Sequence, residues 1–180
     1  MRVLGVDPGS RRTGFGVVER SGNQLRCIVH GAVVPQANLD LPRRLHDLAV
    51  RVGEVMDRTA PQCVVVEEAF YHQSVRSTLV LGHVRGALLV AAVQRGLDVA
   101  EYSPREIKLS VVGSGGATKE QVAFMVRRLL RLRGSLQADA ADALAAALCH
   151  LHQARISAPA RAASAAAERL EALLARRGAR

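Results

Sequence analysis

Apolar and polar positions divide the N-terminal part of the chain into three successive strands. A short apolar run at residues 2–7 ends in an acid followed by a Pro-Gly turn, which is typical of a buried strand leaving a sheet. Residues 14–20 and 24–34 are rich in β-forming side chains, and a short polar turn signal separates them. The pattern therefore predicts that these two segments pair as an antiparallel meander.

Beyond this meander, helical and strand patterns alternate. Apolar residues recur at helical spacing over residues 41–58, and the continuous apolar run at 63–66 predicts a fully buried strand. Residues 76–95 predict a buried helix and residues 97–102 a short strand. Three further helices are expected. The first spans residues 104–112, the second begins at a capping box formed by Thr118 and Gln121, and the third spans about residues 138–152.

This order of elements predicts an α/β fold in which helices cover both faces of a mixed sheet. The composition changes after residue 153, because residues 154–180 consist mainly of Ala, Arg and Glu and include six Arg and two Glu. We therefore expect one core domain at residues 1–153, followed by a helical or partly disordered extension at residues 154–180.

The charge balance favours a polyanionic partner. The chain has 25 Lys and Arg against 16 Asp and Glu, a net charge of +9, and basic surfaces gain free energy by releasing counterions from nucleic acid. The alternative is a generally basic protein from an Arg- and Ala-rich proteome. The three cysteines of this chain are widely spaced, which fits a protein in a reducing cytosol. We expect a cytoplasmic protein with no membrane segment, because no apolar run reaches the length that spans a bilayer.

Two acids follow apolar strands in equivalent positions. Asp7 ends the first strand, and Glu67 ends the most apolar one. If these strands are neighbours in the sheet, the two carboxylates converge at one edge. Two alternatives stay open here. Asp7 is also suited to capping the turn that follows it, and spacing alone does not choose between Glu67 and the adjacent Glu68.

A second pair of acids begins the last predicted helix. Asp139 and Asp142 are three residues apart, so their carboxylates share one helical face, and their Ala neighbours allow another backbone to approach closely. The alternative is that both acids only complement the helix dipole. Together with Asp7 and Glu67 they form a set of oxygen ligands suited to two Mg²⁺ ions, or Mn²⁺ in their place. Such a pair of ions hydrolyses phosphodiesters.

Four segments, taken in order, resemble the RuvC family of Holliday junction resolvases. They are D-P-G-S-R-x-T-G-F-G from residue 7, V-E-E-A-F from residue 66, S-G-G-A-T-K-E-Q-V from residue 114 and Q-A-D-A-A-D-A-L-A from residue 137. The resemblance covers residues 1 to about 152. It implies a ribonuclease-H-like five-stranded sheet flanked by helices, and a homodimer that makes paired symmetric metal-dependent nicks in four-way junction DNA. A branch-migration motor complex is the implied partner.

The same resemblance assigns the catalytic and metal-binding roles to Asp7, Glu67, Asp139 and Asp142, and so chooses Glu67 over Glu68. It also favours Phe70 as a residue that contacts an unpaired base, with Tyr71 beside it. In a chain with only 3% aromatic residues, such a pair suits base stacking. The alternative for Phe70 is a place in the core.

Basic side chains supply further candidates for DNA contact. Lys108 and Lys119 are the only lysines, and a compact ammonium suits a scissile phosphate. A solvated charge is the alternative for each, and the family pattern favours contact with DNA. Arg76 is a further predicted phosphate contact, and Arg11 and Arg12 are additional candidates. The histidines are interpreted as structural or surface groups: His72, His83, His150 and His152.

Two other functions fit parts of the sequence. The glycines and threonine after Asp7 also resemble the first phosphate loop of actin-like ATPases and sugar kinases, although those chains are usually longer and less basic. A junction-binding protein without nuclease activity is the second alternative, with the acids serving as helix and turn caps. No site for an organic cofactor is predicted.

Overall fold

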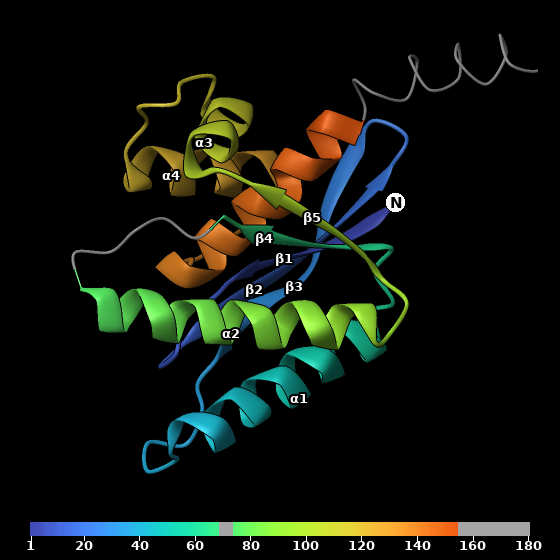
Figure 1. The fold of residues 1–180 in the computed structure, drawn as a ribbon. Helices are drawn as coiled ribbons and strands as arrows, with labels where there is room; N and C mark the ends of the chain where they lie inside the picture. The colour runs from blue at the N-terminus through green and yellow to red at the C-terminus, as the bar shows by residue number, and fades with distance from the viewer. Residues whose placement is uncertain (69–73, 155–180) are drawn as a thin grey trace, which may run out of the picture.

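The computed structural model describes residues 1–68 and 74–154 and contains a central five-stranded sheet with helices on both faces (Figure 1). The predicted α/β class, a mixed five-stranded sheet flanked by helices, is therefore confirmed. The strands are β1 (Arg2–Asp7), β2 (Thr13–Ser21), β3 (Gln24–Val33), β4 (Cys63–Glu67) and β5 (Asp98–Tyr102). The labelled helices are α1 (Leu41–Thr59), α2 (Val75–Val93), α3 (Pro104–Val112) and α4 (Lys119–Leu129). A further helix, called the C-terminal core helix below, spans residues 138–154.

The strand order places β1 in the middle of the sheet. The order is β3-β2-β1-β4-β5, in which β1, β2 and β3 pair in antiparallel fashion, whereas β4 is parallel to both β1 and β5. The antiparallel strands are joined by short connections, and the parallel strands need crossovers, which α1 and α2 supply. Because β1 and β4 are neighbours, their carboxyl ends meet at the same edge of the sheet.

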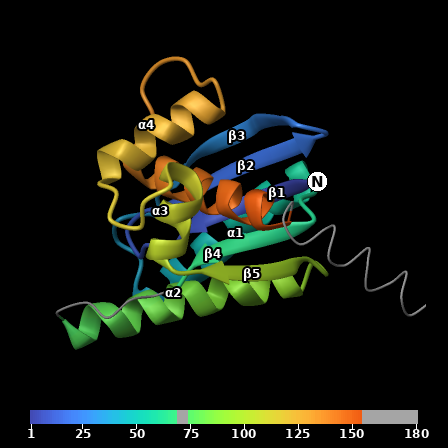
Figure 2. The same ribbon diagram turned by 90° about the horizontal axis from the view of Figure 1, so that it is seen from above.

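Strand alternation divides the apolar side chains between two cores. Val3 and Val65 face a core completed by α3, α4 and the C-terminal core helix, whereas Leu4 and Val64 face a core completed by α1 and α2. Figure 2 shows the C-terminal core helix lying across the sheet with α3 and α4 beside it. The side chain that follows Val6 on β1, that of Asp7, therefore points to the face that carries the C-terminal core helix.

The C-terminal core helix packs against the backbone of the sheet itself. A Cβ atom added to Gly5 would lie 1.8 Å from the carbonyl oxygen of Ala143, and one added to Gly14 would lie 2.1 Å from that of Asp139. Gly16 is similarly close to the side chain of Leu144. Only glycine leaves room for this approach, so glycines on β1 and β2 determine how near the helix and its acids come to Asp7.

Helix α2 differs from its prediction in two ways. It was expected to be buried, but only Val84, Leu88, Ala91 and Ala92 are buried, and His83 is exposed. By length and composition, α2 is also apolar enough to cross a membrane, so the expectation that no segment reaches this length is wrong. Val84, Leu88 and Ala92 pack in the core formed with α1. Because α2 is apolar on all sides, its sequence gave no indication of which face is exposed.

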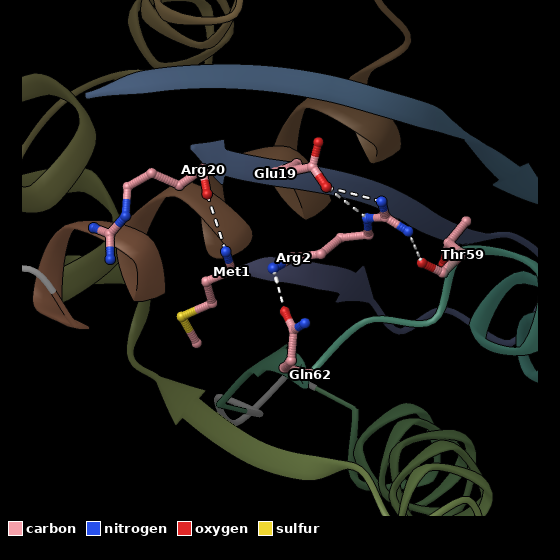
Figure 3. A network of polar contacts seen from close by, with 6 residues as sticks. All are labelled: Met1, Arg2, Glu19, Arg20, Thr59 and Gln62. Carbon is pink, nitrogen blue, oxygen red and sulfur yellow. Dashed lines mark hydrogen bonds and ion pairs between the residues drawn. The ribbon is translucent and has the colours of Figure 1, made fainter. Parts of the chain in front are cut away.

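Polar contacts fix the start of β1, at the opposite end of the strand from Asp7. The Met1 ammonium donates to the carbonyl oxygen of Arg20 at 2.9 Å, and the Arg2 guanidinium donates to Glu19 Oε1 at 2.8 Å (Figure 3). Arg2 also donates to the Thr59 carbonyl and, through its backbone N–H, to Gln62. These contacts join β1 to β2, to the end of α1 and to the segment before β4, and so hold the central strands in register.

The glycine contact beneath the C-terminal core helix gives a first prediction. Gly5→Ala should destabilise the protein by about 2 kcal/mol, because the added methyl group must push the helix away from the sheet. Gly82→Ala is the matched control. Gly82 lies in α2 with nothing within 4 Å of an added Cβ, so alanine there should raise stability by about 0.5–1 kcal/mol. Urea denaturation measures both, and an equally stable Gly5→Ala variant would contradict the packing described.

Candidate active site

Asp7 and Glu67 lie side by side at the ends of β1 and β4. The parallel register pairs Val6 with Val66, so the next residue on each strand, Asp7 and Glu67, occupies the equivalent position. Both side chains point to the face that carries the C-terminal core helix, because Val65 and Val3 lie on that face two and four residues earlier. The strand geometry that was expected to bring these carboxylates together is therefore present.

The C-terminal core helix adds the second pair of acids above these strand ends. Asp139 and Asp142 lie in its first two turns, and the backbone of Asp139 is in contact with Gly14. Gly14 is the residue paired with Asp7 across β1 and β2. The close approach of helix and sheet thus places the carboxylates of the helix, Asp139 and Asp142, above those of the strand ends, Asp7 and Glu67.

The electrostatics of the site reflect this crowding. Burial, together with the negative charges of Asp142, Glu67 and Asp139, raises the pKa of Asp7 from 3.8 to about 7, although the charge of Lys119 opposes the shift. Burial and the charge of Asp142 also raise the pKa of Glu67. A carboxyl group buried among other carboxyl groups is costly to ionise, and a bound cation would remove that cost.

Two cations of the chain engage the acids on the helix. Lys119 Nζ lies 3.1 Å from Asp142 Oδ2, and Arg12 Nε lies 3.5 Å from Asp139 Oδ2. Lys119 is the first residue of α4, after the Thr118 and Gln121 capping box that the sequence predicted. Its hydrogen bond with Asp142 raises the pKa of the Lys119 ammonium, so this charge is firmly retained at neutral pH.

The site opens into a cleft of about 800 Å³ that is lined by both acidic and basic side chains. Asp7, Glu67, Asp142, Lys119 and Arg76 all line this cleft. A smaller hollow beside Glu67 and Asp142 is lined by Lys108 and Lys119. Asp139 does not line the cleft but contributes to the electrostatic field at Asp7. The predicted residues that the structure describes are therefore gathered in one region.

Two arginines that the sequence patterns did not single out also line the cleft. They are Arg44 of α1 and Arg85 of α2. In the sequence, both arginines occupy positions typical of the exposed face of a helix. Their place in the cleft follows only from how α1 and α2 pack. Glu68, which spacing alone could not distinguish from Glu67, also lines the cleft, because β4 ends at Glu67 and strand alternation stops there.

The four carboxylates suit a divalent metal by chemistry and by charge. They offer only oxygen ligands, as Mg²⁺ and Mn²⁺ prefer, and the raised pKa of Asp7 reflects a carboxyl group that is buried beside other carboxyl groups. Within residues 1–68 and 74–154, no three acidic, His or Cys side chains are yet arranged tightly enough to hold a metal ion. Asp139 and Asp142 are instead turned toward Arg12 and Lys119.

Two of the predicted histidines make structural contacts, and three other predicted residues are not described. His150 contacts the hydroxyl group of Tyr102 at 3.0 Å, and His152 contacts Ser110, which agrees with a structural role for both histidines. Three predicted residues fall outside the described residues, as does the extension from residue 155 onward: Phe70, Tyr71 and His72.

The raised pKa of Asp7 gives a prediction about stability without metal. The pKa is higher in the folded protein than in the unfolded chain, so ionisation of Asp7 destabilises the fold progressively as the pH rises from about 4 to about 7. Asp7→Asn removes this cost. In EDTA at about pH 8 we expect the variant to be more stable by roughly 2 kcal/mol, and the gain should vanish near pH 4.

Asp57→Asn is the matched control for this measurement. A hydrogen bond from Arg95 lowers the pKa of Asp57, so the amide there should reduce stability at neutral pH. Urea denaturation at several pH values separates the two cases. A gain for Asp7→Asn that does not depend on pH would contradict the described burial of its carboxylate.

Comparison with known proteins identifies relatives of this chain. The family model described as crossover junction endodeoxyribonuclease RuvC matches residues 3–150. The chain is 49% identical to the RuvC protein of Hyphomonas neptunium over 152 residues, which cover 84% of this chain and 91% of the relative. It is 50% identical to that of Halorhodospira halophila over 175 residues, which cover 93% and 99%.

Solved structures agree with these relatives. Thermus thermophilus RuvC in complex with a Holliday junction substrate superposes with a TM-score of 0.82 at 37% identity, covering 87% of this chain and 96% of that chain. The yeast mitochondrial Holliday junction resolvase Ydc2 superposes with a TM-score of 0.63 at 14% identity, covering 83% and 77%, and shares the fold. These superpositions confirm the ribonuclease-H-like architecture. The chain belongs to the RuvC family of crossover junction endodeoxyribonucleases.

Proposed function

We propose that this chain resolves Holliday junctions in DNA recombination and repair, by making paired symmetric nicks in a divalent-metal-dependent reaction. The observation that carries the proposal is the meeting of Asp7 and Glu67, on adjacent strand ends, with Asp142 in a cleft that also holds Lys119. Membership of the RuvC family supports it, and so does the likeness to a relative in complex with a Holliday junction.

In this proposal Asp7, Glu67, Asp139 and Asp142 are the catalytic metal ligands, and they hold two Mg²⁺ ions, for which Mn²⁺ can substitute. When bound, such ions activate a water molecule and stabilise the leaving oxygen of a phosphodiester. The carboxylates of Asp7 and Glu67 are fixed by the sheet, whereas Asp139 and Asp142 are fixed by the C-terminal core helix. The two pairs therefore approach the reacting phosphate from different elements.

The basic residues around the acids are proposed to hold the DNA strand. Lys119 is 76% exposed and begins α4, so its ammonium and the positive end of the helix dipole both attract a phosphate. Lys108 lies in the hollow beside Glu67, and Arg76 lines the cleft farther along. Phe70 and Tyr71 follow β4 and remain predicted base contacts.

The two other functions are less well supported. The family match over residues 3–150 favours a nuclease over the actin-like ATPases and sugar kinases that the loop after Asp7 resembles. A junction-binding protein without nuclease activity differs from the proposed enzyme in one measurable property. Such a protein binds junctions but does not cut them when Mg²⁺ or Mn²⁺ is added.

We propose a homodimer formed through α2, because paired nicks across a junction need two active sites. Val75, Leu79, Val90 and Val93 of α2 are each between 56% and 65% exposed, and such a long apolar surface needs a partner. A second copy of the chain supplies one by symmetry. Association with a branch-migration motor complex and a cytoplasmic location remain proposals that rest on family membership.

Separate substitution of the two adjacent glutamates, Glu67 and Glu68, tests the proposed site directly. Glu67→Gln should lower the rate of four-way junction cleavage in Mg²⁺ by about 1,000-fold, because the amide cannot supply a charged metal ligand. Asp7→Asn and Asp142→Asn should behave in the same way. Glu68→Gln is the matched control and should cut at nearly the normal rate. Binding to the junction in EDTA, measured by gel shift, should be unchanged in all four variants.

A junction cut at the normal rate by Glu67→Gln would contradict the assigned role of Glu67. Cleavage lost by Glu68→Gln alone would show that the neighbouring acid is the ligand. An equal-length duplex serves as the substrate control, and it should remain intact with every variant.

A charge on α2 tests the proposed dimer. Leu79→Asp should shift the protein from dimer to monomer at micromolar concentration in sedimentation velocity, because a carboxylate buried without a partner opposes association. Leu109→Asp is the control, since Leu109 is 55% exposed on α3, away from α2. A dimer that persists with Leu79→Asp and dissociates with Leu109→Asp would place the interface on α3 instead.

A further inference from the structure

We infer that Arg12 is a positioning residue that acts as the built-in counter-ion of Asp139, pairing with this carboxylate in the metal-free protein and competing with divalent metal for it. The inference rests on the proposed function in one respect, that Asp139 is a metal ligand. It assigns to Arg12 a role that differs from phosphate contact, the role its sequence position suggested. The argument depends on how rigidly each partner is held.

The backbone of Arg12 is fixed by a closed loop after β1. The Thr13 hydroxyl is fully buried, donates to the Gly9 carbonyl at 2.8 Å and accepts from the Gly9 N–H at 3.3 Å. A Cβ atom added to Gly9 would lie 2.1 Å from the Arg12 carbonyl oxygen, so the two ends of the loop are in close contact. The guanidinium therefore extends toward the acids from a fixed point.

Asp139 is held just as firmly on the other side. Its backbone packs on Gly14, where an added Cβ atom would lie 2.1 Å from the Asp139 carbonyl oxygen and 2.9 Å from the Asp139 Cβ. Because Gly14 follows Thr13 directly, the loop that fixes Arg12 continues into the strand that supports Asp139. The 3.5 Å contact between Arg12 Nε and Asp139 Oδ2 thus joins two positions set by the same segment.

The distribution of ion pairs in the pocket supports the counter-ion role. Among the residues that the structure describes, each acid of the C-terminal core helix has one cationic partner, Arg12 for Asp139 and Lys119 for Asp142. No ion pair in this part of the chain involves Asp7 or Glu67. A metal that approaches Asp139 Oδ2 therefore competes with Arg12 for this oxygen.

The exposure of the pair sets how strongly Arg12 competes. The side chains of Arg12 and Asp139 are 47% and 35% exposed, so water screens their attraction and the pair is weak. Such a pair compensates the negative charge of Asp139 in the metal-free protein, but a divalent ion readily replaces the guanidinium. Arg11 is adjacent, lines the cleft and forms no ion pair among the described residues, so it reports the effect of a nearby charge alone.

Calorimetric titration of the full-length chain with Mn²⁺ tests the inference without cleavage. Arg12→Gln should tighten Mn²⁺ binding about threefold relative to Arg11→Gln, the size expected from an exposed ion pair. In an Asp139→Asn background, Arg12→Gln and Arg11→Gln should have equal effects, because the carboxylate that Arg12 occupied is gone. Equal Mn²⁺ affinities for Arg12→Gln and Arg11→Gln with Asp139 intact would overturn the inference.

The same titration distinguishes this inference from the proposed function. If Asp139→Asn alone leaves Mn²⁺ binding unchanged, Asp139 is not a ligand and its role in the proposed function is wrong. If Asp139→Asn weakens binding while Arg12→Gln matches Arg11→Gln, the metal site stands and the role of Arg12 is wrong. Since Arg12 is half exposed, the glutamine variant should fold normally, and urea denaturation in EDTA confirms this.

Discussion

The contact between the C-terminal core helix and the glycines of the sheet is the constraint on which the site depends. Ordinary helix–sheet packing separates backbones by the thickness of two layers of side chains. Here Gly5 and Gly14 have no side chain, and the helix backbone at Ala143 and at Asp139 faces them, so backbone meets backbone. This contact brings Asp139 and Asp142, more than 130 positions along the chain from Asp7, over the ends of β1 and β4.

The cost of that arrangement is electrostatic. Four carboxylates share a partly buried region, and the pKa of Asp7 rises to about 7 as a result. The chain offsets some of the repulsion with Lys119 and Arg12, each paired with an acid of the helix. The net charge of +9 over the whole chain also attracts the DNA backbone, which must approach an acidic pocket that would otherwise repel it.

Much of this arrangement could be predicted from the sequence, and the rest could not for physical reasons. Hydrophobic periodicity located the strands and helices, and Asp7 and Glu67 were recognisable as acids at strand ends. Helix α2 was misjudged because an evenly apolar helix shows no preferred face. The positions of Arg44 and Arg85 in the cleft depend on how α1 and α2 pack, and the pairing of Arg12 with Asp139 depends on contacts between distant segments. Local sequence patterns do not contain that information.

The most direct test of the central claim is anomalous diffraction from crystals of the full-length chain soaked in Mn²⁺. The account predicts anomalous peaks between the ends of β1 and β4 and the start of the C-terminal core helix, with carboxylate oxygens of Asp7, Glu67 and Asp142 at roughly 2.1–2.3 Å. Peaks confined to other acids, such as Glu19 or Asp57, with Asp7 left without metal, would contradict it.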